Sequence, residues 1–324
     1  RKAIKRGSLD RLVCRLYIDL MLSEGPGTGN AHNRRLALLM VFFLSGASGL
    51  IYEVVWSRSL VLVFGSTTYA VSTVLAAFMG GLALGSILVG RRGDRFGHPL
   101  RVYALLEVII AILSLGVLVV LPALVPLYRI AWSFAGASPA ALHALRFMLA
   151  CLVLRPPTTL MGATLPILSA HLERHPGARH SRAHGDASGM GAGALYAANT
   201  IGAVAGTALA GFFLLPLLGL KASAVVAALA NLAAAAAAWR LARSVPPATV
   251  PHGQREAGPE AIPAIEAPIA PVPFTPLLIA FAASGAGALI LEVVWTRILS
   301  LVLGSSTQAF TIMLATFLAG LALG

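Results

Sequence analysis

The feature that most constrains this chain is a series of eight apolar runs, each long enough to cross a membrane as a helix. A spanning helix needs about 20 predominantly apolar residues. The runs cover residues 36–55, 68–89, 102–125, 146–170, 194–218, 222–241, 276–294 and 306–324. Hydrophobic residues make up 58% of the 324 residues and charged residues 11%. A water-soluble domain of this size needs more polar residues to cover its surface. The sequence therefore predicts an all-α, polytopic transmembrane helix bundle of about eight spans.

The positive charge of the chain is confined to the connections between these runs. The net charge is +12, but the basic residues form no contiguous patch, so nucleic acid is not an expected partner. Arginines follow the second, fourth and sixth runs, whereas the odd-numbered connections carry few. By the positive-inside rule, this alternation predicts a multi-pass protein of the inner (plasma) membrane with a cytoplasmic N-terminus and the lipid bilayer as its surroundings.

Composition divides the chain into four parts. Residues 1–35 form a basic cytoplasmic segment, and residues 36–243 form a unit of six transmembrane helices. Residues 244–275 are rich in Pro and Ala and are expected to be a semi-extended cytoplasmic linker. Residues 276–324 begin a second transmembrane unit. We expect its last span to be truncated and the chain to be a fragment at both ends.

The second unit begins with a copy of the first. Residues 45–85 align without a gap to residues 284–324, at an offset of 239, with 25 identities in 41 positions. Apolar composition alone would not keep Glu, Trp, Arg and Gly in register. An even number of spans separates the copies, so the alignment predicts a parallel internal repeat of the kind found in the halves of some transporters.

Each copy contains the stretch E-V-V-W-[S/T]-R, which brings an acid into an apolar span. The carboxylates are Glu53 and Glu292, and each is followed five residues later by Arg58 or Arg297. One interpretation is an interfacial anchor, with Trp in the headgroup region and the charged groups reaching water. The other is a substrate- or proton-coupled site, because a carboxylate in lipid is costly and usually functional. The first interpretation is favoured.

Glycines in the second span and the loop after it suggest structural roles. Gly80, Gly81, Gly85 and Gly90 are expected to let helices approach closely. The loop G-R-R-G-D-R-F-G-H-P at residues 90–99 resembles the loop motif G-x-x-x-D-R-x-G-[R/K]-[R/K] of the major facilitator superfamily, with His and Pro in place of the last two basic residues. Asp94 and Arg95 within it are interpreted as a clamp between helix ends.

Further polar groups lie inside the spans. Arg155 precedes two prolines in the fourth span, which predict a kink and raise the possibility of a cavity there. Glu107 and Asn199 are candidates to line the same cavity, with helix–helix hydrogen bonding as the alternative for Asn199.

No catalytic group, metal site or cofactor site is predicted. The histidines of the connection after the fourth span, His171, His175, His180 and His184, lie in a Gly/Arg-rich segment without the fixed geometry that a metal requires. The sequence also contains no nucleophile–base triad and no nucleotide-binding glycine loop.

Three separate stretches resemble one family. They are SGASGLIYEVVWSR, PPTTLMGATLPIL and LYAANTIGAVAGTALAGFFLLPLLGL. Together they look like the membrane region of the spermidine synthase-like membrane proteins, also described as fused major-facilitator/spermidine synthase proteins. The resemblance covers about residues 36–324. It implies that a cytosolic domain with a Rossmann-like fold follows in the same polypeptide and transfers an aminopropyl group from decarboxylated S-adenosylmethionine to putrescine. The residues for that chemistry have no counterpart in this chain.

Three functions remain open at this point. The first is the membrane region of a spermidine synthase-like protein, involved in polyamine biosynthesis through a domain absent from this chain. The second is a major-facilitator-type transporter of small amines, polyamines or other solutes, which the parallel repeat and the loop motif favour. The third is a membrane scaffold whose helices only position a partner.

Overall fold

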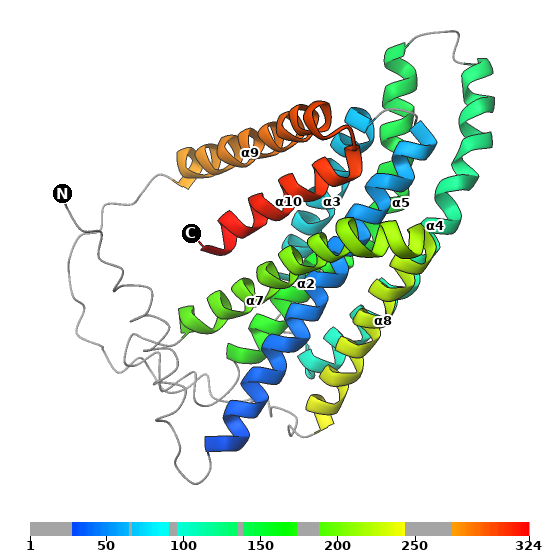
Figure 1. Cartoon of the computed structure of the whole chain (residues 1–324). Coiled ribbons are helices and arrows are strands. Elements are labelled where there is room, and N and C mark those ends of the chain that lie inside the picture. The colour runs from blue at the N-terminus through cyan, green and yellow to red at the C-terminus, as the bar shows by residue number, and fades with distance from the viewer. Residues whose placement is uncertain are drawn as a thin grey trace, which may run out of the picture.

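The computed structural model describes residues 28–64, 67–90, 96–134, 139–173, 188–243 and 274–323, and every regular element in these ranges is helical. The helices, labelled in Figure 1, are α2 (Thr28–Phe64), α3 (Thr67–Gly90), α4 (Pro99–Phe134), α5 (Pro139–Glu173), α7 (Ser188–Leu209), α8 (Leu215–Arg243), α9 (Phe274–Leu303) and α10 (Ser306–Leu323), with a π-helical turn η2 (Ala210–Leu214) joining α7 to α8. The predicted all-α helix bundle is therefore confirmed for the described residues.

Within the described ranges, six helices are long and apolar enough to cross a membrane, where the sequence predicts eight spans. One reason for the difference is that residues 192–243 count as a single run of 52 residues. The other is that the apolar part of α10, Thr307–Leu323, is slightly shorter than a full span. Six helices of this length and hydropathy indicate a multi-pass membrane protein.

The long run from α7 to α8 changes direction at Gly219. This residue has φ 76° and ψ −178°, which is not helical. A residue with a side chain adopts a positive φ only at a cost, so glycine suits this position. Figure 1 shows that the chain turns back between α7 and α8, and both helices pack against α2. The run therefore consists of two arms.

Small residues bring the helices of the first unit together. A Cβ atom at Gly85 would overlap the backbone of Thr159, and one at Gly206 would overlap the backbone of Ala47. These contacts bring α3 close to α5 and α2 close to α7, two of the most extensive helix pairs. The predicted close packing is confirmed for Gly81 and Gly85, whereas a Cβ at Gly80 or Gly90 would meet no described atom.

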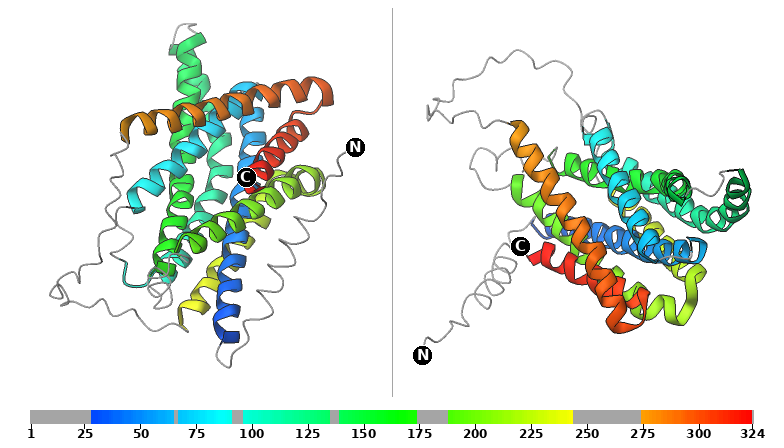
Figure 2. Two further views of the ribbon diagram at one scale, coloured as in Figure 1. Left: turned by 90° about the vertical axis from the view of Figure 1, so that its left-hand side faces the viewer. Right: turned by 90° about the horizontal axis from the view of Figure 1, so that it is seen from above.

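The two copies of the repeat have the same helix boundaries. Helix α2 ends at Phe64 and α3 begins at Thr67, while α9 ends at Leu303 and α10 begins at Ser306. The last residues of α2 and α9 are 239 positions apart, and so are the first residues of α3 and α10. Helix α9 runs along the outside of the bundle, where most of its side chains are exposed (Figure 2). Each copy is thus a helix–break–helix unit in the same register.

Several boundaries differ from those expected. Helix α2 begins at Thr28, inside the predicted basic segment 1–35, and α9 begins at Phe274, inside the predicted linker 244–275. His171 belongs to the last turn of α5 and is buried, so it is not a loop residue. The rest of the linker, the clamp residues Asp94 and Arg95, and the other three histidines of that connection lie outside the described residues.

Candidate functional site

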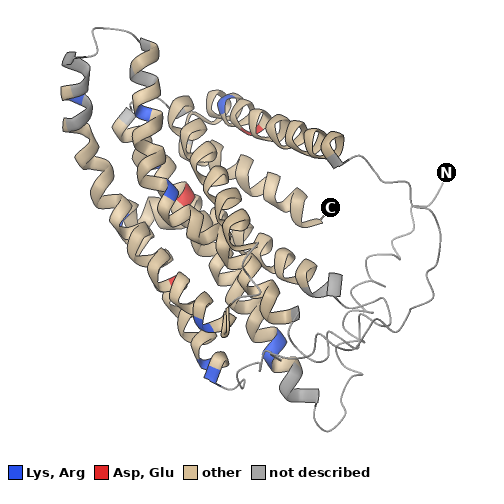
Figure 3. Ribbon diagram, turned by 180° about the vertical axis from the view of Figure 1, so that it is seen from behind, with Lys and Arg blue, Asp and Glu red and all other residues tan. Residues whose placement is uncertain are grey.

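The repeat places two carboxylates at equivalent positions, Glu53 on α2 and Glu292 on α9. Acidic residues are rare along the described helices (Figure 3), yet these two are 0% and 2% exposed. None of their four carboxylate oxygens has a hydrogen-bond partner among the described residues. The residues directly after them, Val54 and Val293, line one small cavity. A buried carboxylate without a partner is costly, so this pair requires a functional explanation.

A cavity of about 20 Å³ lies between the two copies, next to this pair. We call it the shared cavity. Its lining residues are Val54, Ser57, Arg58, Val61, Thr68 and Val71 from the first copy and Val293, Thr296, Arg297, Ser300, Thr307 and Phe310 from the second. Each residue of the first set corresponds to one of the second at the offset of 239. The copies therefore contribute the same six positions to one cavity, which has room for a water molecule or a small ionic group.

The carboxylates lie one helical turn from two hydroxyls of the shared cavity. Ser57 follows Glu53 by four residues and Thr296 follows Glu292 by four, so each pair shares one face of its helix. The Thr296 hydroxyl donates to the Glu292 carbonyl at 2.9 Å. The Ser57 hydroxyl is buried and has no hydrogen-bond partner among the described residues. Unused hydrogen-bonding capacity thus extends from the carboxylates to the cavity.

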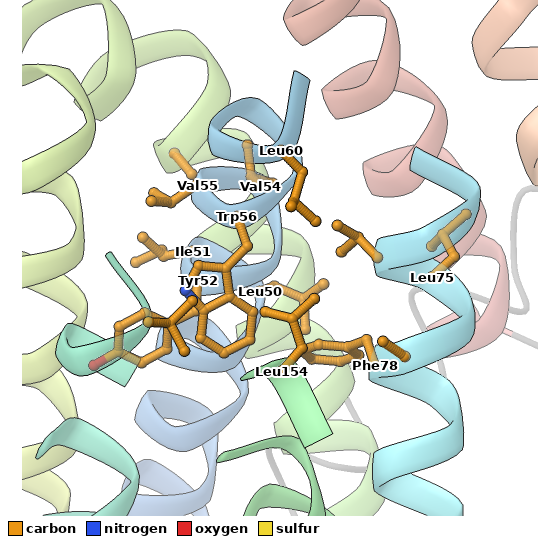
Figure 4. Packing of buried hydrophobic residues seen from close by; sticks show 14 of the residues in the cluster. Leu50, Ile51, Tyr52, Val54, Val55, Trp56, Leu60, Leu75, Phe78 and Leu154 are labelled. Atoms are coloured by element: carbon orange, nitrogen blue, oxygen red, sulfur yellow. The ribbon is translucent and has the colours of Figure 1, made fainter. Parts of the chain in front are cut away.

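The tryptophans of the two copies have different surroundings. Trp56 is 0% exposed and stacks on Tyr52, with ring centroids 5.5 Å apart (Figure 4). The Phe78 ring also packs against Trp56, with ring centroids 6.5 Å apart. Trp295 is 53% exposed. The favoured interpretation, in which Trp lies in the headgroup region and Glu reaches water, is therefore wrong for the first copy, because tertiary packing encloses Glu53 and Trp56 inside the bundle.

A third carboxylate, Glu107 on α4, has a different environment. It is 0% exposed and accepts one hydrogen bond from the Ser45 hydroxyl and one from the Asn231 side-chain amide, both at 2.6 Å. Ser45 and Asn231 belong to α2 and α8, so this cluster joins three helices. Sequence reasoning missed Asn231, although an amide within an Ala-rich apolar span is a signal that could have identified it.

The structure does not bring Glu107, Asn199 and Arg155 to one cavity. The backbone of Asn199 packs against Gly46, and the side chain of Arg155 is exposed on α5. Helix α5 continues without a break through Pro156 and Pro157. Thr158, just after them, donates to the Leu154 carbonyl at 2.8 Å. The prolines therefore do not end the helix, and the shared cavity lies between α2, α3, α9 and α10 instead.

This arrangement offers groups that can bind an ion. Two carboxylates with unused oxygens can bind a proton or a cationic group, and charges in a low-dielectric interior interact strongly. Hydroxyls and two arginines lie toward the shared cavity. Among the described residues, no group of three or more His, Cys, Asp or Glu side chains is placed to hold a metal ion.

Comparison of the chain with models of known protein families, with curated proteins and with solved structures finds no match in any of the three. The case for a function therefore depends on the residues and on their arrangement in the structure.

Proposed function

We propose that this chain is part of a membrane transporter and that Glu53 and Glu292 bind the cationic group of its solute or the coupling proton. The observation that carries the proposal is the pair itself: equivalent carboxylates of two repeat copies, both buried, with all four oxygens lacking a hydrogen-bond partner among the described residues. A membrane protein retains such a pair only where a ligand or proton offsets its cost.

The location of the pair supports transport over a purely structural role. Transporters built from repeats bind their substrates and coupling ions at the interface between the repeats. The shared cavity lies at such an interface, since it is lined by the same six positions of each copy. The expected parallel, major-facilitator-like arrangement of about eight spans belongs to this proposal, and the matching boundaries of α2–α3 and α9–α10 support it. Small amines and polyamines are the solute class, because protonated amines complement carboxylates.

Reconstitution of the full chain in lipid vesicles tests this proposal. Uptake of radiolabelled putrescine and spermidine is measured for the wild type, Glu53→Gln and Glu292→Gln. Each variant keeps the side-chain size and removes the charge, so we expect at least a tenfold loss of uptake, on the order of the 1.4 kcal/mol that a tenfold change represents. Glu107→Gln is the matched control, because Glu107 is buried but already hydrogen-bonded. Equal uptake by all four proteins, or none by the wild type, would contradict the proposal.

The three family-like stretches support a second candidate function. We propose on that basis that the chain is the membrane region of a spermidine synthase-like protein, with aminopropyl transfer performed by a cytosolic domain of the same polypeptide. The two candidates are compatible, since both concern polyamines. The sequence beyond Gly324 tests the second: a glycine-rich strand–loop–helix with acidic residues is expected, and its absence would rule this candidate out. If the detached cytosolic domain works equally well, the membrane region is only a scaffold.

A further inference from the structure

The shared cavity carries positive charge that the proposed cation site does not use. Arg58 and Arg297 both line it, from equivalent positions of the two copies. None of the described residues that line the cavity has a carboxylate. Glu53 and Glu292 are nearby, but their oxygens are buried and make no hydrogen bond to these guanidinium groups. Both arginine side chains are exposed as well as lining the cavity, so an anion bound there can contact two positive groups.

The cavity also contains a buried hydroxyl that is free to donate. Ser57 is 4% exposed, and its hydroxyl has no hydrogen-bond partner among the described residues. The hydroxyls of Thr296 and Ser300 instead donate to carbonyls of their own helix, at 2.9 Å and 2.7 Å. The donors that remain toward the cavity therefore include Ser57 and the two guanidinium groups. A buried donor without a partner is expected to meet a ligand or water.

From these observations we propose that the shared cavity binds an oxyanion, a carboxylate or phosphate group, between Arg58 and Arg297, with Ser57 as a third donor. Guanidinium groups present paired N–H donors that match the two oxygens of such a group. The aliphatic side chains of Val54, Val61 and Val293 also line the cavity. They offer no hydrogen bond, so the polar contacts of the anion are with the arginines and Ser57. Two sources share this chemistry: a free anion, or the phosphate of a lipid headgroup at the cavity mouth. The site is separate from the carboxylate pair and does not depend on a cation binding there.

Binding of inorganic phosphate to the purified full chain in a phosphate-free detergent tests the free-anion source. Titration calorimetry compares the wild type with Arg58→Gln, Arg297→Gln and the double variant. We expect each single variant to weaken binding about tenfold, as loss of one charge-assisted pair does. Arg58→Lys is expected to bind more weakly than the wild type and more tightly than Arg58→Gln. Arg240→Gln is the matched control, because Arg240 is an exposed arginine of α8 outside the cavity.

Native mass spectrometry with added phosphatidylglycerol tests the lipid source. A retained lipid that is lost in the double arginine variant, and retained in Arg240→Gln, supports the site with a headgroup phosphate as its ligand. Phosphate binding that is lost in the same variant supports it with a free anion. If the double variant binds phosphate and retains the lipid as well as the wild type does, the two arginines contact only solvent and the proposal is overturned. Unchanged thermal unfolding of each variant shows that a loss of binding is not a loss of fold.

Discussion

Glu53 and Glu292 are 239 positions apart in the sequence, yet both are buried, and the residues directly after them, Val54 and Val293, line the same cavity. They occupy the same position in two copies of one repeat, so a single sequence element supplies both members of the pair.

The first prediction concerns this pair. Glu53→Gln and Glu292→Gln are expected to have non-additive effects on stability, because each removes the repulsion that the other experiences. The coupling in a double-mutant cycle should be about 0.5–3 kcal/mol. Thermal or denaturant unfolding of the four proteins in detergent measures it. A cycle between Glu53→Gln and Glu107→Gln is the control, and equal coupling in the two cycles would mean that the repeat-related pair is not special.

The second prediction concerns the cluster around Glu107. Asn231→Ala removes a donor at 2.6 Å from the buried Glu107 carboxylate. The expected loss of unfolding free energy is about 1–3 kcal/mol. Thr316→Ala is the control, because its exposed hydroxyl donates only to the Ile312 carbonyl of its own helix. A stability of Asn231→Ala equal to that of this control would show that the cluster does not hold the three helices together.

The third prediction separates glycines by their contacts. Gly85→Ala places a methyl group against the backbone of Thr159, so α3 and α5 must move apart. We expect a loss of roughly 1–3 kcal/mol, typical of overpacking. Gly80→Ala, five residues earlier in the same helix, meets no described atom and should be neutral or slightly stabilising. Unfolding midpoints and expression levels of the two variants measure the difference, and the opposite order would refute the observed packing.

The fourth prediction concerns the reversal between α7 and α8. Gly219→Ala puts a side chain on a residue with φ 76°. The strain should cost about 1–2 kcal/mol. Gly116→Ala in α4 is the control, because a Cβ there meets no described atom and φ is not positive. Comparable stability of both variants would mean that the chain does not need glycine to turn back at this position.

The helices were largely predictable, because the information that determines them is local. Apolar runs of the required length gave the helices, and the repeat predicted matching units with the same break. The differences were at helix boundaries, and the count of eight spans stays a prediction. Helix α2 extends back to Thr28, for example, because polar residues can continue a helix beyond the apolar core. The number of spans depends on Gly219, whose backbone angles no hydropathy pattern encodes.

The candidate site was predictable only in part. The repeat identified Glu53, Arg58, Glu292 and Arg297, but nothing in the sequence placed the two copies face to face across one cavity. Glu107 was identified as an intramembrane polar group without its partners. Its partner Asn231 is 124 residues away, and such a pairing arises only when helices pack.

What the sequence by itself determined is the membrane-spanning character, the helical elements and the positions of the rare charged groups, because hydropathy and helix periodicity act over a few turns of one segment. What only the tertiary structure decided is the surroundings of those groups. Trp56 and Trp295 show this directly. They come from the same E-V-V-W-[S/T]-R stretch, yet one is 0% and the other 53% exposed. Burial depends on which neighbouring helices pack against a face, and those contacts are made between segments far apart in the chain.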